Sequence, residues 1–545
     1  MTTIRTSGAG PAARQACIRA TVTIGGLAVY WQLGMQDLHS LGKAAAFILI
    51  ANFGLAGLLL LRCQCRLVSI GALLINSLVI LNASVEGCLF WLYGLAPKSI
   101  VVADAILGSN PNETREFIET YWMHLSLVAA LSIALIVLLC WVERRLRTLA
   151  PAIESSNRRG RWLGIAMLTL FAALHLNKTM AHENPLVYWP GYFAGYQEQR
   201  EFLDTVKTKV ASDLAAVNKA DAIYMGPERH TLVLVLGESI NRNNWSLYGY
   251  PRKTTPQLDL MRKDLTVFQH VLSSDASTAA SLLKMLTPAT LDHPDAWTSQ
   301  PNILALARKA GYHVVWLSNQ EKGDGQIQIL AEHANEQIFV NDGHGRATRS
   351  LDERLLPKLA GVLAGSAPRK LVVVHMQGAH LRYDLRYPAT FDRFSRADDK
   401  VINSLKQAGR PFWIRRARND YDNAMLYTDH VIASIIRSSS QASSAAATTL
   451  LYVSDHGQEV GHYRSFAGHS SIDPSGYQVP LLLWNSGTQP LSAERAALEQ
   501  RLYRTDNLDH TLLGLLQIQT RFYDAGNDLL SRRFVSSDPN PLSQQ

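Results

Sequence analysis

The chain has 545 residues, more than one ordinary hydrophobic core accommodates. Hydrophobic residues make up 47% of it and are concentrated in the first third, whereas the remainder has the mixed composition of a soluble domain. The net charge of +8 does not indicate nucleic-acid binding, because much of the arginine lies beside apolar segments, as membrane topology requires. All five cysteines lie in the apolar third, so the region after residue 180 has no disulfide and no thiol ligand or nucleophile.

Five segments of the first third are long and apolar enough, or nearly so, to cross a bilayer. A hydrocarbon core of about 30 Å needs roughly 20 apolar residues of helix. The fifth segment is the shortest and reaches residue 180 only by tilting or by snorkelling of Lys178. We therefore expect a transmembrane anchor over residues 1–180 with five helices, at 20–36, 44–61, 67–85, 125–142 and 162–176.

The arginines of this anchor predict its orientation. They precede the first segment, separate the second from the third, and separate the fourth from the fifth. With five spans these three groups share one side, which the positive-inside rule assigns to the cytoplasm. The rest of the chain is then exported, and the stretch PLVYWPGYFAGY follows where an interfacial aromatic belt is expected. We expect interfacial or linker helices over 181–228, an exported catalytic domain over 229–535 and a disordered tail over 536–545.

Apolar runs alternate with helical stretches after residue 230, which is the pattern of a sheet covered by helices. The clearest strands are 232–236, 313–317, 371–375 and 449–453. Three of them end in polar residues that can bind metal, in the stretches GES, HMQGAH and SDHGQEVGH. Ligands of open α/β sheets bind beyond the carboxyl ends of the strands. The pattern predicts a soluble α/β domain with a central, mostly parallel sheet and a site at this edge.

The adjacent pair Asp455-His456 is the most specific local signal. A carboxylate oxygen and an imidazole nitrogen suit zinc, and neighbouring residues at a strand end can turn toward one ion. These residues also have purely structural alternatives. Asp455 could cap the following helix, and His456 could pack in the protein interior. Glu238, at the end of another predicted strand, could be a loop carboxylate at a helix N-terminus. The structural alternatives are less favoured when the residues are considered jointly, because Glu238 and the Asp455-His456 pair both follow strands of one predicted sheet. We expect Glu238, Asp455 and His456 to bind a single metal ion.

A zinc ion with these three ligands has room for a fourth. The stretch SSDASTAASLLKML places Ser277 or Thr278 at the start of a helix, where backbone N–H groups and the dipole favour an anion. A hydroxyl bound to zinc loses its proton more easily and becomes a nucleophile toward phosphorus. Serine and threonine are also ordinary helix N-caps, so this stretch alone leaves both roles open.

Histidines near two strand ends would complete a phosphoryl-transfer site. The reaction needs charge stabilisation on the phosphoryl oxygens and an acid for the leaving group. Each histidine taken singly has packing or surface exposure as its alternative role. The four are His375, His380, His462 and His469.

Five stretches, taken in chain order, point to one family. They are GESINRNNWSLYGYPRKTTPQLD, ASTAAS, HMQGAHLRYDLRYP, YDNAMLYTDHVI and SDHGQEVGH. They resemble the phosphoethanolamine transferases of bacterial inner membranes, which belong to the alkaline phosphatase and sulfatase superfamily. The resemblance implies a multi-pass inner-membrane protein whose periplasmic domain takes phosphoethanolamine from phosphatidylethanolamine, releases diacylglycerol, and passes the group from a phospho-threonine to an acceptor.

The resemblance also implies roles for single residues. Glu238, Asp455 and His456 match the metal ligands, and Thr278 matches a nucleophile that contacts the metal. This ligand set implies one tightly bound zinc ion and leaves room for a second.

Further residues match the family's substrate contacts. His380 and His469 match histidines that hold the phosphoryl group, a second metal or the leaving group. Asn319 and Gln320 lie where the family has polar substrate contacts. Glu113, in an exported loop that predicts a short amphipathic helix starting at Pro111, resembles a carboxylate near the ethanolamine ammonium.

The positions of the cysteines bear on the identity of the acceptor. Lipid A-modifying members have cysteines around the nucleophile, whereas this chain resembles the cysteine-free branch that modifies lipopolysaccharide core sugars or periplasmic glucans. We therefore expect phosphatidylethanolamine, membrane lipids and a lipopolysaccharide or glucan acceptor as partners, and no nucleic acid.

A sulfatase would need a C/S-x-P-x-R motif, and residues 273–286 contain neither Pro nor Arg. A lipoteichoic-type glycerol-phosphate transferase, or another phosphatase or phosphodiesterase of the superfamily, is the alternative. A non-catalytic sensor would not require all four residues of the predicted metal site.

Overall fold

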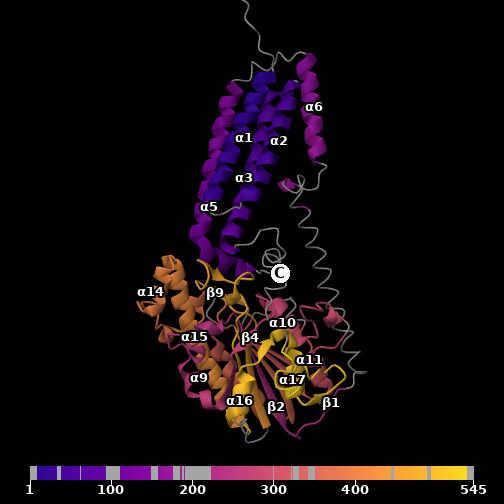
Figure 1. Ribbon diagram of the computed structural model, residues 1–545, viewed down its shortest axis with the longest axis vertical. Helices are drawn as coiled ribbons and strands as arrows, with labels where there is room; N and C mark the ends of the chain where they lie inside the picture. The colour runs from indigo at the N-terminus through magenta and orange to yellow at the C-terminus, as the bar shows by residue number, and fades with distance from the viewer. Residues whose placement is uncertain are drawn as a thin grey trace, which may run out of the picture. The chain divides into compact units, whose positions relative to one another are not determined.

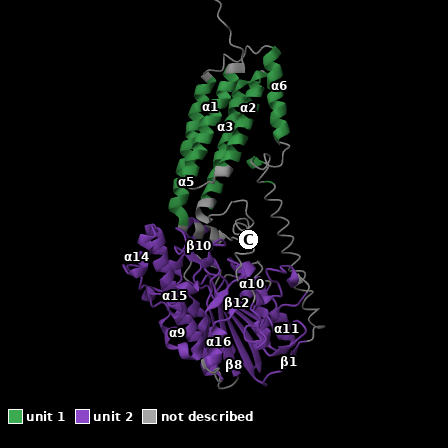
Figure 2. Cartoon of the chain, viewed as in Figure 1, with its two compact units in different colours: residues 1–108, 121–201 green, residues 109–120, 202–545 purple. Residues whose placement is uncertain are grey.

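The computed structural model describes residues 9–33, 38–61, 63–93, 111–148, 158–175, 184–186, 190, 222–298, 300–320, 322, 330–341, 350–442, 447–487 and 492–536. Two compact units divide the chain (Figure 2). Unit 1 comprises Met1–Gly108 and Tyr121–Glu201, and unit 2 comprises Ser109–Thr120 and Phe202–Gln545. Most of the predicted linker at 181–228 and of the tail at 536–545 lies outside the described residues.

Long helices occupy all five predicted segments of the anchor. Three of them, at Leu41–Leu60, Cys65–Leu89 and Tyr121–Arg147, are long and apolar enough to cross a membrane. The first helix carries Arg14 and Arg19 among its apolar residues, and the last has only 18 residues and begins with arginine. The helices are confirmed, whereas the number of membrane crossings stays a prediction. Their bounds are α1 (Ala9–Gln32), α2 (Leu38–Leu60), α3 (Cys65–Tyr93), α5 (Pro111–Thr148) and α6 (Arg158–His175).

The helix expected at Pro111 begins there but does not end as a separate short element. It continues as α5 past a kink at Tyr121, whose backbone is not helical, and then becomes the fourth anchor helix. Asn110 and Pro111 predicted the start of this helix, whereas its continuation past Tyr121 was not predicted.

Polar side chains inside unit 1 are paired with one another. Arg19 donates from Nε to Oε1 of Glu143 at 2.5 Å, and both side chains are buried. The amides of Asn52 and Asn76 exchange two hydrogen bonds of 3.0 and 3.1 Å. Because unpaired polar groups are costly in a bilayer, such pairs fix which helices neighbour one another.

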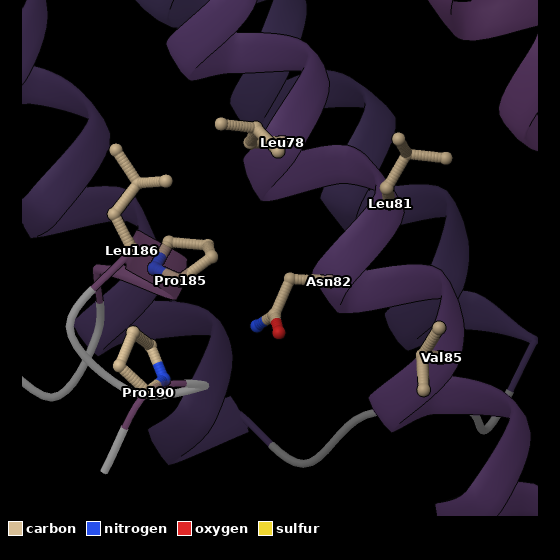
Figure 3. A pocket seen from close by; sticks show the side chains of 7 residues that line it. All are labelled: Leu78, Leu81, Asn82, Val85, Pro185, Leu186 and Pro190. Carbon is tan, nitrogen blue, oxygen red and sulfur yellow. The ribbon is translucent and has the colours of Figure 1, made fainter. Parts of the chain in front are cut away.

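Unit 1 also contains a cavity of about 410 Å³ beside α3 (Figure 3). Among the described residues that line it, Asn82 contributes the only polar side chain. The lining residues are Leu78, Leu81, Asn82, Val85, Pro185, Leu186 and Pro190.

Unit 2 is built on a seven-stranded sheet of order β3-β11-β8-β2-β7-β5-β6. Its core is parallel, as predicted, and β11 alone runs against the other six strands. All four strands expected from the sequence are present. The strands are β2 (His230–Gly237), β3 (Leu265–Phe268), β5 (His313–Ser318), β6 (Glu336–Phe339), β7 (Arg369–His375), β8 (Ala447–Ser454) and β11 (Leu481–Asn485).

Both faces of this sheet are buried because helices cover each of them (Figure 1). Every residue of β2 is buried, and its successive side chains alternate between two apolar clusters. One cluster includes α10 (Thr278–Leu286), α11 (Ile303–Lys309) and α17 (Leu508–Leu515). The other includes α13 (Leu355–Ala364) and the long helix α15 (Phe412–Ala442). This burial explains why the central strands are continuous apolar runs.

Short elements complete unit 2. A small hairpin follows β8 and carries part of the predicted site, with strands β9 (Glu459–Val460) and β10 (Ala467–Gly468). The others are β1 (Ile223–Tyr224) paired with β13 (Ile518–Gln519), β4 (His270–Leu272) paired with β12 (Leu502–Arg504), α9 (Pro256–Leu260), α14 (Lys400–Gln407) and α16 (Ser492–Glu499).

Candidate active site

The candidate site lies where β2 and β8 end side by side. These strands are parallel, and their last paired residues are Gly237 and Ser454. Glu238 and Asp455 therefore leave the sheet at the same edge, as the sequence predicted. The backbone N–H of Asp455 continues this pairing by donating to the carbonyl oxygen of Gly237 at 3.1 Å.

Thr278 reaches this edge from a third part of the chain. It is the first residue of α10, after the N-cap Ser277. Its Oγ1 lies 3.2 and 3.0 Å from the two carboxylate oxygens of Glu238, and 3.3 Å from Nε2 of His456. The structure thus brings together the hydroxyl, carboxylate and imidazole that the sequence singled out.

The three predicted metal ligands carry an unfavourable charge when no cation is bound. Glu238, Asp455 and His456 are all 0% exposed. Burial raises the pKa of Asp455, and the neighbouring charge of Glu238 raises it further. Burial alone would lower the pKa of His456, but the two carboxylates outweigh it and raise that pKa. Two buried carboxylates this close are stabilised by a positive partner, either the protonated His456 ring or a bound cation.

A divalent cation fits this donor set. One ligand atom each from Glu238, Asp455 and His456 lies within 4.8 Å of the others. Oδ2 of Asp455 is buried and makes no hydrogen bond with any residue that the structure describes, although it lies 3.5 Å from Nε2 of His456. The other ring nitrogen of His456 is 2.7 Å from the carbonyl oxygen of Gly457, which orients Nε2 toward the carboxylates. Carboxylate oxygen and imidazole nitrogen are zinc ligands, and the Thr278 hydroxyl stands close enough to be a fourth donor.

Two of the four predicted histidines join the same cluster. His380 and His469 form a second set of potential ligand atoms with Glu238, again within 4.8 Å of one another. Their rings are 5.9 Å apart between centroids, and the His469 ring is 4.4 Å from that of His456. Both therefore lie beside Glu238, and His469 also lies beside His456.

The other two histidines do not join the site. His375, the last residue of β7, is fully buried with its ring centroid 5.8 Å from that of Trp316. Nε2 of His462 is 2.8 Å from Oδ1 of Asn244, and burial lowers the pKa of His462. Both histidines are part of the packing, which was the alternative role considered for each.

Ser239 is part of the site although its role was not predicted. Its Oγ donates to Oε1 of Glu238 at 2.7 Å and lies 3.4 Å from Nε2 of His469. Its backbone N–H donates to Oδ1 of Asp455 at 3.0 Å. These contacts require a left-handed backbone with φ of 61°, which costs a non-glycine residue about 1–2 kcal/mol. The hydroxyl of Tyr421 donates to the carbonyl oxygen of Ser239 at 2.7 Å and supports this conformation.

Gly378 lets the loop after β7 approach Glu238. Its φ is +54°, and a Cβ at this position would lie 2.4 Å from the backbone oxygen of Glu238. Buried Asp352 accepts hydrogen bonds from the backbone N–H groups of Gln377 and Gly378 at 2.8 and 2.9 Å. The loop that carries His380 is thereby fixed against the end of β2.

The predicted substrate contacts differ in their placement. Nδ2 of Asn319 donates to Oδ1 of Asp352 at 2.8 Å, so this amide holds the loop after β7 rather than facing the carboxylates. Nε2 of Gln320 donates to the carbonyl oxygen of Met376 at 2.8 Å and lies 3.5 Å from Glu238. The Glu113 side chain lies outside the described residues. A substrate role for these residues stays a prediction.

Comparison with known proteins agrees with this geometry. The sulfatase family profile matches residues 230–518, which include every residue of the cluster. Phosphoethanolamine transferase EptC of Escherichia coli strain K12 is 30% identical over 472 residues, which cover 82% of this chain and 80% of that protein. This chain belongs to the phosphoethanolamine transferases of the sulfatase family.

Solved structures of other phosphoethanolamine transferases cover both units. The C-terminal periplasmic domain of Escherichia coli EptC, crystallised in complex with Zn, has 33% identity and a TM-score of 0.55 over 59% of this chain and 93% of that chain. The integral membrane protein lipooligosaccharide phosphoethanolamine transferase A of Neisseria meningitidis has 20% identity and a TM-score of 0.61 over 95% of this chain and 98% of that chain. The second comparison shows the fold alone. This phosphoethanolamine transferase therefore combines a helical N-terminal region with an alkaline-phosphatase-like domain.

Proposed function

We propose that the protein transfers phosphoethanolamine from phosphatidylethanolamine to a lipopolysaccharide or glucan acceptor, through a covalent intermediate on Thr278. The observation that carries this proposal is the position of the Thr278 hydroxyl. It starts a helix, where the dipole and free N–H groups favour an anionic phosphoryl group, and it lies 3.0 Å from a buried carboxylate. The relatives named above transfer the same group.

In the first half-reaction, Oγ1 of Thr278 bonds to phosphorus and gives up its proton. The bond between phosphorus and the glycerol oxygen breaks, and that oxygen takes up a proton as diacylglycerol leaves. In the second, an acceptor hydroxyl bonds to phosphorus and loses its proton, and the Thr278 oxygen regains one. In each step one bond to phosphorus forms and one breaks, and an acid must protonate the oxygen that leaves.

His380 and His469 are placed to handle these protons. Each has a ring nitrogen within 4.8 Å of a carboxylate oxygen of Glu238, the residue that the Thr278 hydroxyl contacts, and His469 is partly exposed to solvent. The Ser239 hydroxyl links Glu238 to His469 through contacts of 2.7 and 3.4 Å. A proton accepted at Glu238 therefore has a route through the Ser239 hydroxyl to the partly exposed His469.

Glu238, Asp455 and His456 would hold a divalent cation, with Thr278 as the fourth donor. When bound, such an ion lowers the pKa of a neighbouring hydroxyl and stabilises charge on a phosphoryl group. The protein contributes by holding the ligands of this ion in a fixed orientation. Ser239 and Gly457 orient the carboxylates and the imidazole through the hydrogen bonds described above.

The cellular setting follows from the same family argument. We place the five anchor helices in the bacterial inner membrane and the catalytic domain in the periplasm. This arrangement gives the site access to a lipid donor, and the arginine distribution of the anchor supports it.

Donor turnover tests the proposal. Purified full-length protein is mixed with phosphatidylethanolamine that carries a fluorescent acyl chain, and fluorescent diacylglycerol is measured with and without lipopolysaccharide or glucan. We expect diacylglycerol release that Thr278→Ala abolishes and Thr278→Ser partly retains. Release from phosphatidylglycerol in place of phosphatidylethanolamine would instead support the glycerol-phosphate transferase.

A further inference from the structure

The edge of unit 2 that carries the site also presents exposed aromatic side chains. Phe412 and Trp413 open α15 and are 58% and 36% exposed, and Tyr463, in the β9–β10 hairpin, is 51% exposed. The rings of Phe412 and Trp413 meet edge to face with centroids 5.5 Å apart. Exposed clusters of large apolar side chains mark interaction sites. We call Phe412, Trp413 and Tyr463 the aromatic patch.

The hairpin and the start of α15 form one surface. Nε of Arg418 donates to the carbonyl oxygen of Val460 at 2.8 Å, and Nε of Arg410 donates to that of Gly461 at 3.1 Å. Gly461 also packs closely on the helix, because a Cβ there would lie 2.6 Å from Cγ2 of Ile414. The hairpin that carries Tyr463 is therefore fixed against the start of α15, which carries Phe412 and Trp413.

This surface lies at the carboxyl edge of the sheet. The helix α15 precedes the parallel strand β8, so it runs against that strand and begins at the edge where β8 ends. The hairpin follows directly after Asp455 and His456 and leads to His469. Within unit 2, Figure 1 shows α14, β9 and α10 at the same end of the sheet. The elements that carry the aromatic patch therefore lie at the same edge of the sheet as the candidate site.

The aromatic patch is flanked by positive charge. Arg410, Arg415 and Arg416 surround it in the stretch GRPFWIRRAR. Arg410 and Arg415 donate to backbone carbonyl oxygens, and no carboxylate of the described residues pairs with either. The Arg416 side chain is 78% exposed, and its Nε lies 3.7 Å from Oδ2 of Asp420, which is a long ion pair. The surface around the aromatic patch therefore presents positively charged side chains to solvent.

We propose that the aromatic patch docks into the headgroup layer of an anionic phospholipid bilayer. Aromatic rings favour the level of the headgroups, and arginine binds their phosphates, so this composition matches a bilayer surface. Such a surface is always within reach, because unit 2 is joined to helices long and apolar enough to cross a membrane. Docking would turn the carboxyl edge of the sheet toward the lipid. If the proposed function holds, the donor headgroup would reach Thr278 without leaving the bilayer, although docking itself does not depend on that function.

Depth-dependent quenching tests this proposal on the full-length protein. The five native cysteines are replaced by alanine, and one cysteine is introduced by Ser465→Cys, an exposed position of the hairpin, and labelled with an environment-sensitive fluorophore. The matched control is Ser486→Cys. This exposed serine follows β11 at the opposite edge, where its backbone N–H donates to Thr448. Both proteins are reconstituted into vesicles of phosphatidylethanolamine and phosphatidylglycerol with and without a nitroxide lipid labelled near the headgroup.

We expect the label at 465 to shift to shorter wavelength and to lose most of its fluorescence to the nitroxide, while the label at 486 changes in neither respect. Replacing Phe412 and Trp413 by serine should remove the quenching at 465, and raising the salt concentration should weaken it. Equal quenching at the two positions, or quenching at 465 that survives the double substitution, would overturn the proposal. A wavelength shift without nitroxide quenching would also overturn it, because protein rather than lipid would then cover the aromatic patch. No transfer reaction is measured, so this result stands apart from the proposed activity.

Discussion

Oγ1 of Thr278 lies 3.0 Å from Oε2 of Glu238, although the two residues are 40 positions apart in the chain. One begins a helix that packs on the sheet, and the other follows the central strand β2. Their meeting places a hydroxyl against a buried carboxylate at a helix N-terminus. That contact joins the potential nucleophile to the potential metal site, and the remaining chemistry depends on it.

Loss of one carboxylate should remove the metal. Asp455→Asn keeps the size of the side chain but removes its charge, so we expect zinc affinity to fall by more than the roughly 10–100-fold seen when outer hydrogen-bonding partners of a ligand are lost. Zinc content after dialysis against a graded chelator measures this. The control is Asp429→Asn. Asp429 is also fully buried, but it lies on α15 and is not one of the predicted metal ligands. Full zinc retention by Asp455→Asn would refute the ligand assignment.

Ser239 should contribute through both its hydroxyl and its backbone. Ser239→Ala removes the hydrogen bond to Glu238 but keeps the cost of a left-handed φ. Ser239→Gly removes the same hydrogen bond and also that cost, so we expect the glycine variant to be about 1 kcal/mol more stable than the alanine variant. Both should lose zinc affinity and turnover to a similar degree, since both lack the hydroxyl.

Thermal unfolding with zinc titration separates the two effects of Ser239. If the alanine and glycine variants were equally stable, the left-handed backbone would carry no cost. If both kept wild-type zinc affinity, the hydroxyl would have no role in positioning Glu238.

Buried Asp509 should make the folded protein less stable as the pH rises. Burial raises the pKa of this residue from 3.8 to about 8, with the charge of Asp506 adding to the effect. Between these two values the folded state binds more protons than the unfolded state, so the free energy of unfolding falls as the pH rises through the window. Asp509→Asn stays neutral at every pH and should flatten this slope. The measurement is the thermal midpoint of both proteins across that pH range, and parallel curves would contradict the expectation.

The sequence was sufficient for the parts of the fold that repeat a simple pattern. All four predicted strands are continuous apolar runs, and burial on both faces makes such runs easy to recognise. The strands β3, β6 and β11 were not predicted. In β6, Glu336 and Gln337 are exposed at the sheet edge and interrupt the apolar character of the strand. The end of the Pro111 helix was also missed, since the continuation of α5 past Tyr121 depends on context beyond the local pattern.

The candidate site could be anticipated only in part. Glu238, Asp455 and His456 were found because each follows a strand, and neighbouring parallel strands end together. The placement of Asn319 on Asp352, and the left-handed backbone of Ser239, depend on contacts between distant segments that leave no periodic signal. The choice between four similar histidines likewise required coordinates, because sequence spacing cannot show which of them face the same space.

Intact mass of the protein purified from a membrane that contains phosphatidylethanolamine is the most direct test of the central claim. We predict a fraction whose mass is increased by one phosphoethanolamine group on Thr278, which disappears in Thr278→Ala and on addition of a competent acceptor. A protein that turns over the lipid donor yet never carries this group on Thr278 would contradict the covalent mechanism.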